Sequence, residues 1–132
     1  MNRTLAAASG LAALAAAIHI IMGGNGVVDP LLASMLESWP KQVLYAVWHM
    51  GSVALALSSV ALLIGGLPRH AVAARYLVLF VSVLWCCFAG VFLAVIAIQP
   101  EPGWLFKLPQ WALLLPVGLL GLWASVRTRG RT

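Results

Sequence analysis

The stretch LVLFVSVLWCCFAGVFLAVIAI, residues 77–98, decides the fold class of this chain. Its 22 residues include no charged side chain. A helix of that length is about 33 Å long, enough to cross the roughly 30 Å hydrocarbon core of a bilayer. Lipid offers backbone groups no hydrogen-bond partner, so such a segment must satisfy them internally. The stretch therefore predicts a transmembrane α-helix.

The rest of the chain repeats this pattern. Residues 5–24, 43–64 and 108–126 are also apolar runs of spanning length, separated by segments that contain glycine and proline. The chain is 63% hydrophobic and 8% charged, whereas soluble domains carry about 25% charged residues. We therefore predict an all-α integral membrane protein in which residues 1–132 form a single four-transmembrane-helix bundle. This composition excludes a soluble enzyme and leaves no length for a separate catalytic module.

The positive charges predict an orientation. Most Lys and Arg residues fall on one side of a four-span topology, and only Lys41 and Lys107 fall on the other. Because Lys and Arg accumulate on the cytoplasmic side, we predict a protein of the bacterial inner membrane with both termini in the cytoplasm. The net charge of +5 does not indicate nucleic acid as a partner, since the charges flank apolar runs and form no patch with interleaved aromatic residues. The residues on the cytoplasmic side are Arg3, Arg69, Arg75, Arg127, Arg129 and Arg131.

Two segments in the N-terminal third of the chain can each be interpreted in two ways. Residues 5–24 follow an arginine, as the apolar region of a signal peptide would, but the run continues to full spanning length, so we expect a retained helix. Farther along, Asp29-Pro30 is a helix-start signal and Pro40 a stop signal. Residues 30–38 place their apolar side chains on one face, which predicts a short amphipathic interfacial helix. An irregular loop is the alternative.

Two histidines are the ionisable residues inside the predicted spans, and such residues are functional candidates. His19 and His49 lie on helices of opposite direction at a similar depth, within about 6–9 Å of the outer boundary. His19 shares its helix face with small residues, including Ala12, Ala16 and Gly23, which let two helices approach closely. We therefore expect the His19 side of the first helix to face protein.

The second apolar run carries a polar stripe. Tyr45, His49 and Ser52 recur at helical spacing along an otherwise apolar helix. If this face meets His19, the four side chains converge in the outer half of the bundle, and Glu37 approaches from the interfacial helix. We predict a ligand-binding site at these five residues, with His19 and His49 as its metal ligands if it holds a metal.

Several ligands fit such a cluster. Neutral imidazoles bind haem iron and transition metals, and they form hydrogen bonds with a quinone or a lipid headgroup. A small binding or accessory protein in the lipid bilayer, alone or within a larger membrane complex or homo-oligomer, is our leading hypothesis. Three alternatives stay open: a proton relay, a homo-oligomeric transporter or channel lined by the stripe, and a structural scaffold in which each histidine only donates a hydrogen bond to a neighbouring helix.

Missing motifs favour binding over catalysis. The chain has no H-E-x-x-H, Walker A, G-x-S-x-G or C-x-x-C motif. The predicted spans contain no Asp, Glu, Lys or Arg, which argues against an antiporter with a membrane carboxylate. We therefore expect a protein that is not an enzyme.

Two short motifs carry a resemblance. Residues 19–24 have the pattern H-x-x-x-G-G, and residues 45–49 have the pattern Y-x-x-W-H. Through them, the chain from about residue 15 to residue 60 resembles a group of small four-span bacterial membrane proteins. The resemblance implies four spans and a shared role for the two histidines, and it implies no activity.

Overall fold

The computed structural model describes residues 1–127, and every regular element in that range is helical. Three helical segments are long and apolar enough to cross a membrane, and a shorter apolar helix follows them. The all-helical membrane architecture expected from the sequence is confirmed at this level. Arg129 and Arg131, which contribute to the predicted orientation, lie outside the described residues. The elements are α1 (Arg3–Gly23), the π-helical turn η1 (Gly24–Val28), α2 (Asp29–Ala33), α3 (Ser38–Gly66), the short turn η2 (Pro68–His70), α4 (Arg75–Ala97), α5 (Trp104–Lys107) and α6 (Trp111–Arg127).

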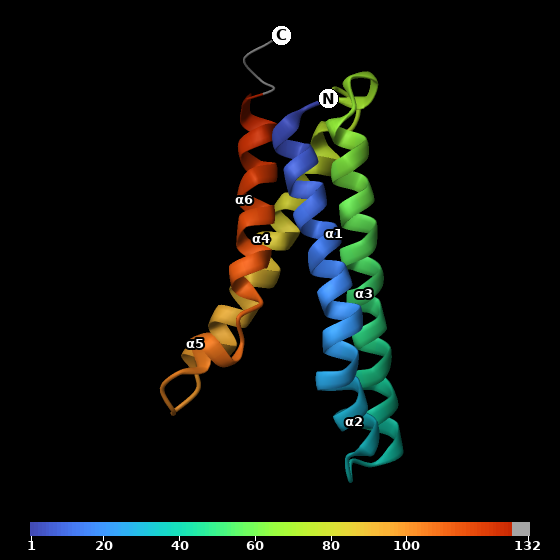
Figure 1. Ribbon diagram of the computed structural model, residues 1–132, viewed down its shortest axis with the longest axis vertical. Coiled ribbons are helices and arrows are strands. Elements are labelled where there is room, and N and C mark those ends of the chain that lie inside the picture. The colour runs from blue at the N-terminus through green and yellow to red at the C-terminus, as the bar shows by residue number, and fades with distance from the viewer. Residues whose placement is uncertain (128–132) are drawn as a thin grey trace.

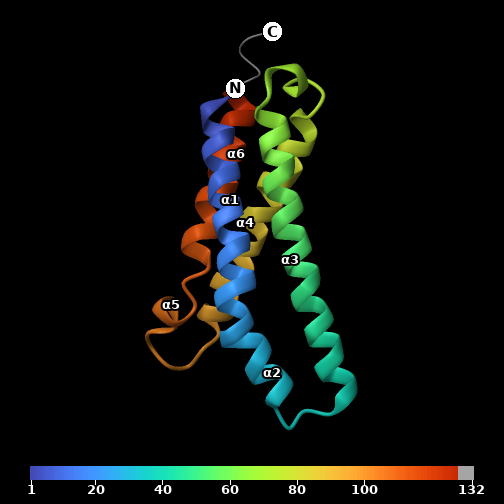
Figure 2. The ribbon, with the colours of Figure 1, turned by 45° about the vertical axis from the view of Figure 1, so that its right-hand side comes forward.

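The helices form two antiparallel pairs (Figure 1, Figure 2). In one pair α1 packs along α3, in the other α4 packs along α6, and α1 also contacts α6. Figure 1 shows the two pairs meeting at the end where α1 begins and α6 ends, and diverging toward the opposite end. His19 and the polar stripe both belong to the α1–α3 pair, so that pair alone builds the candidate site.

Small residues bring the helices together. A methyl group added at Gly121 of α6 would overlap with the Ser82 side chain of α4. Between the two helix pairs, a methyl group added at Gly65 of α3 would overlap with the Val78 side chain of α4. Trp85 of α4 is fully buried among these contacts. Lipid is as apolar as the side chains, so close backbone approach and van der Waals contact, and not hydrophobic burial, stabilise such an assembly.

The segment after α1 differs from the sequence-based prediction. The glycine-rich residues 24–26 do not end the helix, because the backbone continues through η1 into α2, which ends at Ala33. Asp29 has helical φ and ψ, so it lies inside the helical run and is not its N-cap. In apolar surroundings an unpaired backbone group costs several kcal/mol, whereas a glycine costs a helix only about 1 kcal/mol, and this favours continuation. A short extension of α1 thus replaces the separate amphipathic helix over residues 30–38.

Prolines set where α3 and α6 begin. α3 starts at Ser38, ahead of Pro40, because the first N–H groups of a helix have no intrahelical partner and proline is tolerated there. α6 starts at Trp111 and not at the predicted residue 108. The cause is that Leu108 precedes Pro109 and takes non-helical angles (φ −120°, ψ 70°). With 17 residues, α6 is only about 26 Å long.

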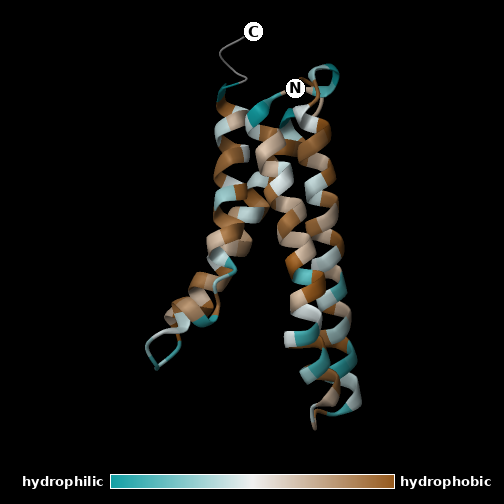
Figure 3. Cartoon of the chain, in the orientation of Figure 1, coloured by the Kyte–Doolittle hydropathy of each residue, from teal (hydrophilic) through white to brown (hydrophobic). Residues whose placement is uncertain are grey.

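Hydropathy varies along the length of the molecule. Figure 3 shows hydrophilic residues gathered at the two ends and apolar residues over most of the helices between them. Large apolar side chains such as Ile21, Val53 and Phe80 are more than half exposed. A lipid solvent accommodates such a surface, whereas water would drive it to associate.

Candidate functional site

His19 of α1 packs face to face on Trp48 of α3. The ring centroids are 3.8 Å apart and the ring planes differ by 14°. The Nε2 atom of His19 also lies 3.4 Å from the Trp48 carbonyl oxygen, so the imidazole contacts both the indole and the backbone of one residue. Gly51 borders the same ring, since a methyl group there would be 3.6 Å from Nε2. The His19 side of α1 therefore faces α3, as expected.

Gly23 makes room for the same indole. A Cβ atom at Gly23 would overlap with the Trp48 ring and would lie 2.7 Å from its Cζ2 atom. His19 and Gly23 are four residues apart, which places them on one face of α1. The H-x-x-x-G spacing thus combines a stacking residue with a residue that leaves space for the stacked partner.

His49 has a different environment from His19. Its ring meets the Tyr45 ring edge-on, with centroids 4.5 Å apart and planes 86° apart. The two residues are one turn apart on α3, and the His49 side chain is exposed. It borders a shallow hollow of about 500 Å³ whose other lining residues are Ala46, Met50, Val53 and Ala54. The lining of this open depression on the outside of α3 is almost wholly apolar, and His49 borders it.

Three serine hydroxyl groups of α1 and α3 donate to backbone carbonyls within this helix pair. Ser52 Oγ donates to the Trp48 carbonyl oxygen at 3.2 Å, the same oxygen that His19 approaches. Farther along, Ser59 Oγ donates to the Ser9 carbonyl at 3.2 Å, and Ser9 Oγ donates to the Ser59 carbonyl at 2.9 Å. The Ser9 and Ser59 hydroxyl groups therefore join α1 to α3, whereas that of Ser52 bonds within α3.

Glu37 lies apart from the histidines. It precedes α3, its side chain is exposed, and its backbone carbonyl accepts a hydrogen bond from the Lys41 amide at 3.2 Å. Its position is twelve residues before His49, which corresponds to about 18 Å along the helix axis. The structure therefore does not bring this carboxylate to the imidazoles.

The two imidazoles have separate aromatic partners. His19 is stacked on Trp48, and His49 is in edge contact with Tyr45. Within residues 1–127, no group of three or more His, Cys, Asp or Glu side chains is placed to hold a metal ion. His19 and Ser52 both approach the carbonyl oxygen of Trp48. Tyr45 and His49 are in contact with each other, and His49 borders the apolar hollow.

Trp48 is a site residue that sequence reasoning did not single out. It contacts His19 through its ring and through its carbonyl oxygen, and it fills the space left by Gly23. Its chain position next to His49, inside the Y-x-x-W-H motif, is the signal that could have identified it. An aromatic residue in an apolar run is ordinarily interpreted as packing, and no helical periodicity reveals which residue of another helix it meets.

No known protein family, curated protein or solved structure matches this chain. The resemblance carried by the two motifs consequently stays a prediction. What the site does must therefore follow from the chemistry of its own residues.

Proposed function

We propose that this chain is a small binding protein of the bacterial inner membrane, which crosses the bilayer four times with both termini in the cytoplasm. The length and apolar composition of the three long helices support this placement. A helix as short as α6 is accommodated by modest bilayer thinning. Arg3, Arg75 and Arg127 lie together at the end where the chain begins, and positively charged ends face the cytoplasm.

One observation carries the binding role, namely an exposed imidazole at an apolar hollow. His49 shares that hollow with Ala46, Met50, Val53 and Ala54. An ionisable side chain inside a membrane span is costly unless it meets a partner. A ligand with a hydrogen-bonding head and an apolar body meets both requirements, because its head pairs with His49 while its body covers the hollow.

The chemistry of the two ring systems favours a quinone ring or a lipid headgroup as that head. A neutral imidazole both donates and accepts hydrogen bonds, and the Tyr45 hydroxyl beside it can do the same. The metal site predicted from the sequence needs His19 and His49 at one centre. One face of the His19 ring is covered by Trp48 and its Nε2 atom lies next to a carbonyl oxygen, which favours the hydrogen-bonded ligand over the metal.

The same contacts weigh against the alternative functions. A transporter or channel lined by the stripe would need hydroxyl groups open to a hydrated path, whereas those of Ser52 and Ser59 donate to backbone carbonyls. A purely structural scaffold would leave His49 exposed within the span, in edge contact with Tyr45 but with no hydrogen-bond partner among residues 1–127 to offset its cost.

Quinone and lipid binding to the full chain test the proposal. The protein is reconstituted in phosphatidylcholine nanodiscs and titrated with a short-chain benzoquinone, whose binding quenches the fluorescence of nearby indoles such as Trp48. Lipids retained through purification are measured in parallel by native mass spectrometry. We expect one of these ligands to bind saturably and His49→Leu to weaken that binding about tenfold, as expected for the loss of one hydrogen bond.

His70→Leu is the matched control, because His70 lies in the loop η2 far from the hollow along the chain. This variant should bind as the parent does. Equal binding by the parent and His49→Leu, or the absence of any saturable quinone or lipid, would contradict the proposal. A purified protein that contains haem or stoichiometric metal would favour the metal site instead.

A further inference from the structure

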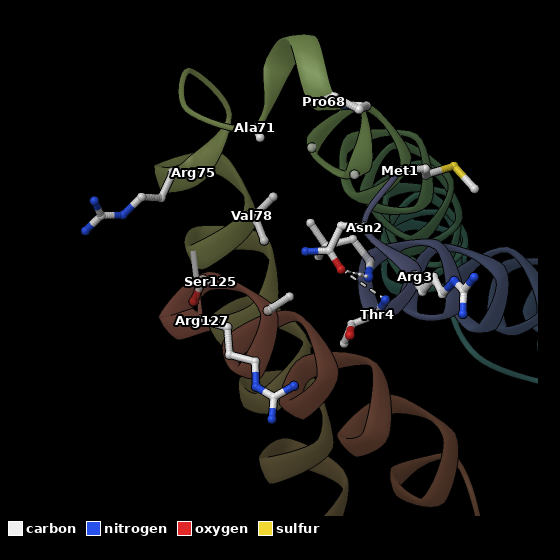
Figure 4. Close-up of a pocket in the computed structure, with 14 residues that line it drawn as sticks. Met1, Asn2, Arg3, Thr4, Pro68, Ala71, Arg75, Val78, Ser125 and Arg127 are labelled. Carbon is white, nitrogen blue, oxygen red and sulfur yellow. Dashed lines mark hydrogen bonds between the residues drawn. The ribbon is translucent and has the colours of Figure 1, made fainter. Parts of the chain in front are cut away.

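A second hollow lies at the end of the molecule where α1 begins and α6 ends (Figure 4). Its volume is about 820 Å³, within the range of roughly 300–1,000 Å³ that is typical of small-ligand sites. Its walls come from the start of α1, the end of α3, the start of α4 and the end of α6. It is thus the place where α1, α3, α4 and α6 meet, and it is separate from the His49 hollow.

Positive charge surrounds this hollow, and none of the described residues that line it is acidic. Arg3, Arg75 and Arg127 line it from three different helices. Within residues 1–127, the one ion pair joins Lys107 to Glu101 in the segment around α5. The three guanidinium groups therefore lack a carboxylate partner in the part of the chain that the structure describes.

Aromatic neighbours hold two of these arginines at the rim. The Arg75 guanidinium lies 5.3 Å from the Tyr76 ring centroid, and the Arg127 guanidinium lies 4.5 Å from the Trp123 ring centroid. Tyr and Trp favour the membrane–water interface, so these pairs place both cations at the depth of lipid headgroups. Figure 4 shows the side chains of Arg3, Arg75 and Arg127 extending from the rim in different directions.

A free hydrogen-bond donor points into the opening. Asn2 caps α1 through its Oδ1 atom, which accepts from the backbone amides of Thr4 and Leu5 at 3.0 and 3.3 Å. Capping uses only the oxygen, and the Nδ2 group makes no hydrogen bond with another described residue. In Figure 4 the Asn2 side chain extends across the hollow toward Val78. The backbone amide of Asn2 donates to the Gly66 carbonyl at 2.8 Å, which fixes this position.

We propose that this hollow binds the phosphate of an anionic phospholipid headgroup. The Asn2 Nδ2 group donates to a phosphate oxygen, and the guanidinium groups of Arg3 and Arg127 compensate its negative charge. The acyl chains lie on the apolar outer sides of the helices, next to exposed residues such as Val126. The proposal rests only on the membrane placement of the proposed function and not on the His49 site.

Lipid selectivity measured on the full chain tests this site. The protein is equilibrated in vesicles or micelles that contain phosphatidylglycerol and phosphatidylcholine, and bound lipid is counted by native mass spectrometry. We expect phosphatidylglycerol to be retained preferentially. The double variant Arg3→Gln, Arg127→Gln should bind it about 30-fold more weakly, because each arginine near an anionic headgroup contributes roughly fivefold.

Two further variants separate a built site from general surface charge. Asn2→Asp keeps an N-cap of similar strength but replaces the free amide by a negative charge, so it should also lose phosphatidylglycerol. Arg69→Gln removes one positive charge from the same end of the molecule, but Arg69 does not line the hollow, so this variant should retain the lipid.

Three results would overturn the proposal. The first is equal retention of both lipids by the parent, and the second is a loss in Arg69→Gln as large as that in the double variant. The third is saturable binding of inorganic phosphate that the double variant loses while its retention of phosphatidylglycerol is unchanged, which would indicate a free phosphate as the ligand. Binding of the benzoquinone in the same preparations reports on the His49 site, so failure of either proposal is recognisable separately.

Discussion

Replacing Gly23 by alanine should disrupt the contact between His19 and Trp48. The added methyl group would lie 2.7 Å from the Cζ2 atom and 3.6 Å from the Cζ3 atom of the Trp48 ring. Carbon atoms in contact are ordinarily about 3.5–4.0 Å apart, so the ring must move by about 1 Å or more. The imidazole of His19 already covers one face of that ring at 3.8 Å, so the indole cannot move freely in both directions.

The size of the effect follows from two opposing contributions. Overpacking a filled contact costs about 1–3 kcal/mol in the free energy of unfolding, whereas glycine to alanine in a helix contributes about 0.5–1 kcal/mol of stability. Gly10 is the matched control, because it lies in the same helix and a methyl group there would meet nothing within 4 Å. The helix contribution is common to both substitutions, so Gly23→Ala should be less stable than Gly10→Ala by about 1–3 kcal/mol.

Unfolding of the purified protein in mixed micelles, followed by circular dichroism as the denaturing detergent is increased, measures this difference. Gly10→Ala should unfold at or above the detergent fraction required for the parent, and Gly23→Ala below it. If the two variants are equally stable to within about 0.5 kcal/mol, the contact between Gly23 and Trp48 does not constrain the protein and the reasoning is refuted.

Three other predictions concern the helix pairs and the topology. Ser9→Ala and Ser59→Ala should each lower the free energy of unfolding by about 0.6 kcal/mol, the average measured for hydrogen bonds between membrane helices, and the same detergent titration checks both. Gly121→Leu would overlap with Ser82 and should separate α4 from α6, which cross-linking between cysteines introduced into the two helices would register as a lost product. A fluorescent protein fused to the C-terminus should fluoresce and an alkaline phosphatase fused there should be inactive, and the opposite result would reverse the proposed orientation.

Several properties of the fold were predictable because they depend on local chemistry. The apolar run that forms α4 must be helical in lipid, and α4 spans Arg75–Ala97 where residues 77–98 were expected. The end of α3 at Gly66 likewise coincides with a glycine pair followed by Pro68. Three helix boundaries were predicted less accurately. The helix continues past Gly24, α3 begins at Ser38, with Pro40 in its first turn, and not at residue 43, and α6 begins after Pro109 and not at Leu108. In each case the outcome depended on the surroundings of a glycine or a proline.

The site was only partly predictable for the same reason. The helical period placed His19 on a face of small residues, and that face does pack on α3. Periodicity contains no information about which residue on the other helix is opposite, so Trp48 went unnoticed and His49 was expected to join His19. A difference of one position on α3 turns a side chain by about 100°, which suffices to move His49 from the contact with α1 to the exposed side.

By itself, the sequence predicted a lipid environment, a helical architecture and the positions of the few polar residues in the spans. These properties follow from the transfer free energy of each side chain and from the need of each backbone group for a hydrogen bond, and both act residue by residue. The tertiary structure alone decided that His19 is covered by Trp48 while His49 stays exposed, and that three arginines from separate helices surround one hollow. Those outcomes depend on which helices approach each other closely. Small residues such as Gly23 and Gly121 determine this, because they pack against residues that are distant in the sequence.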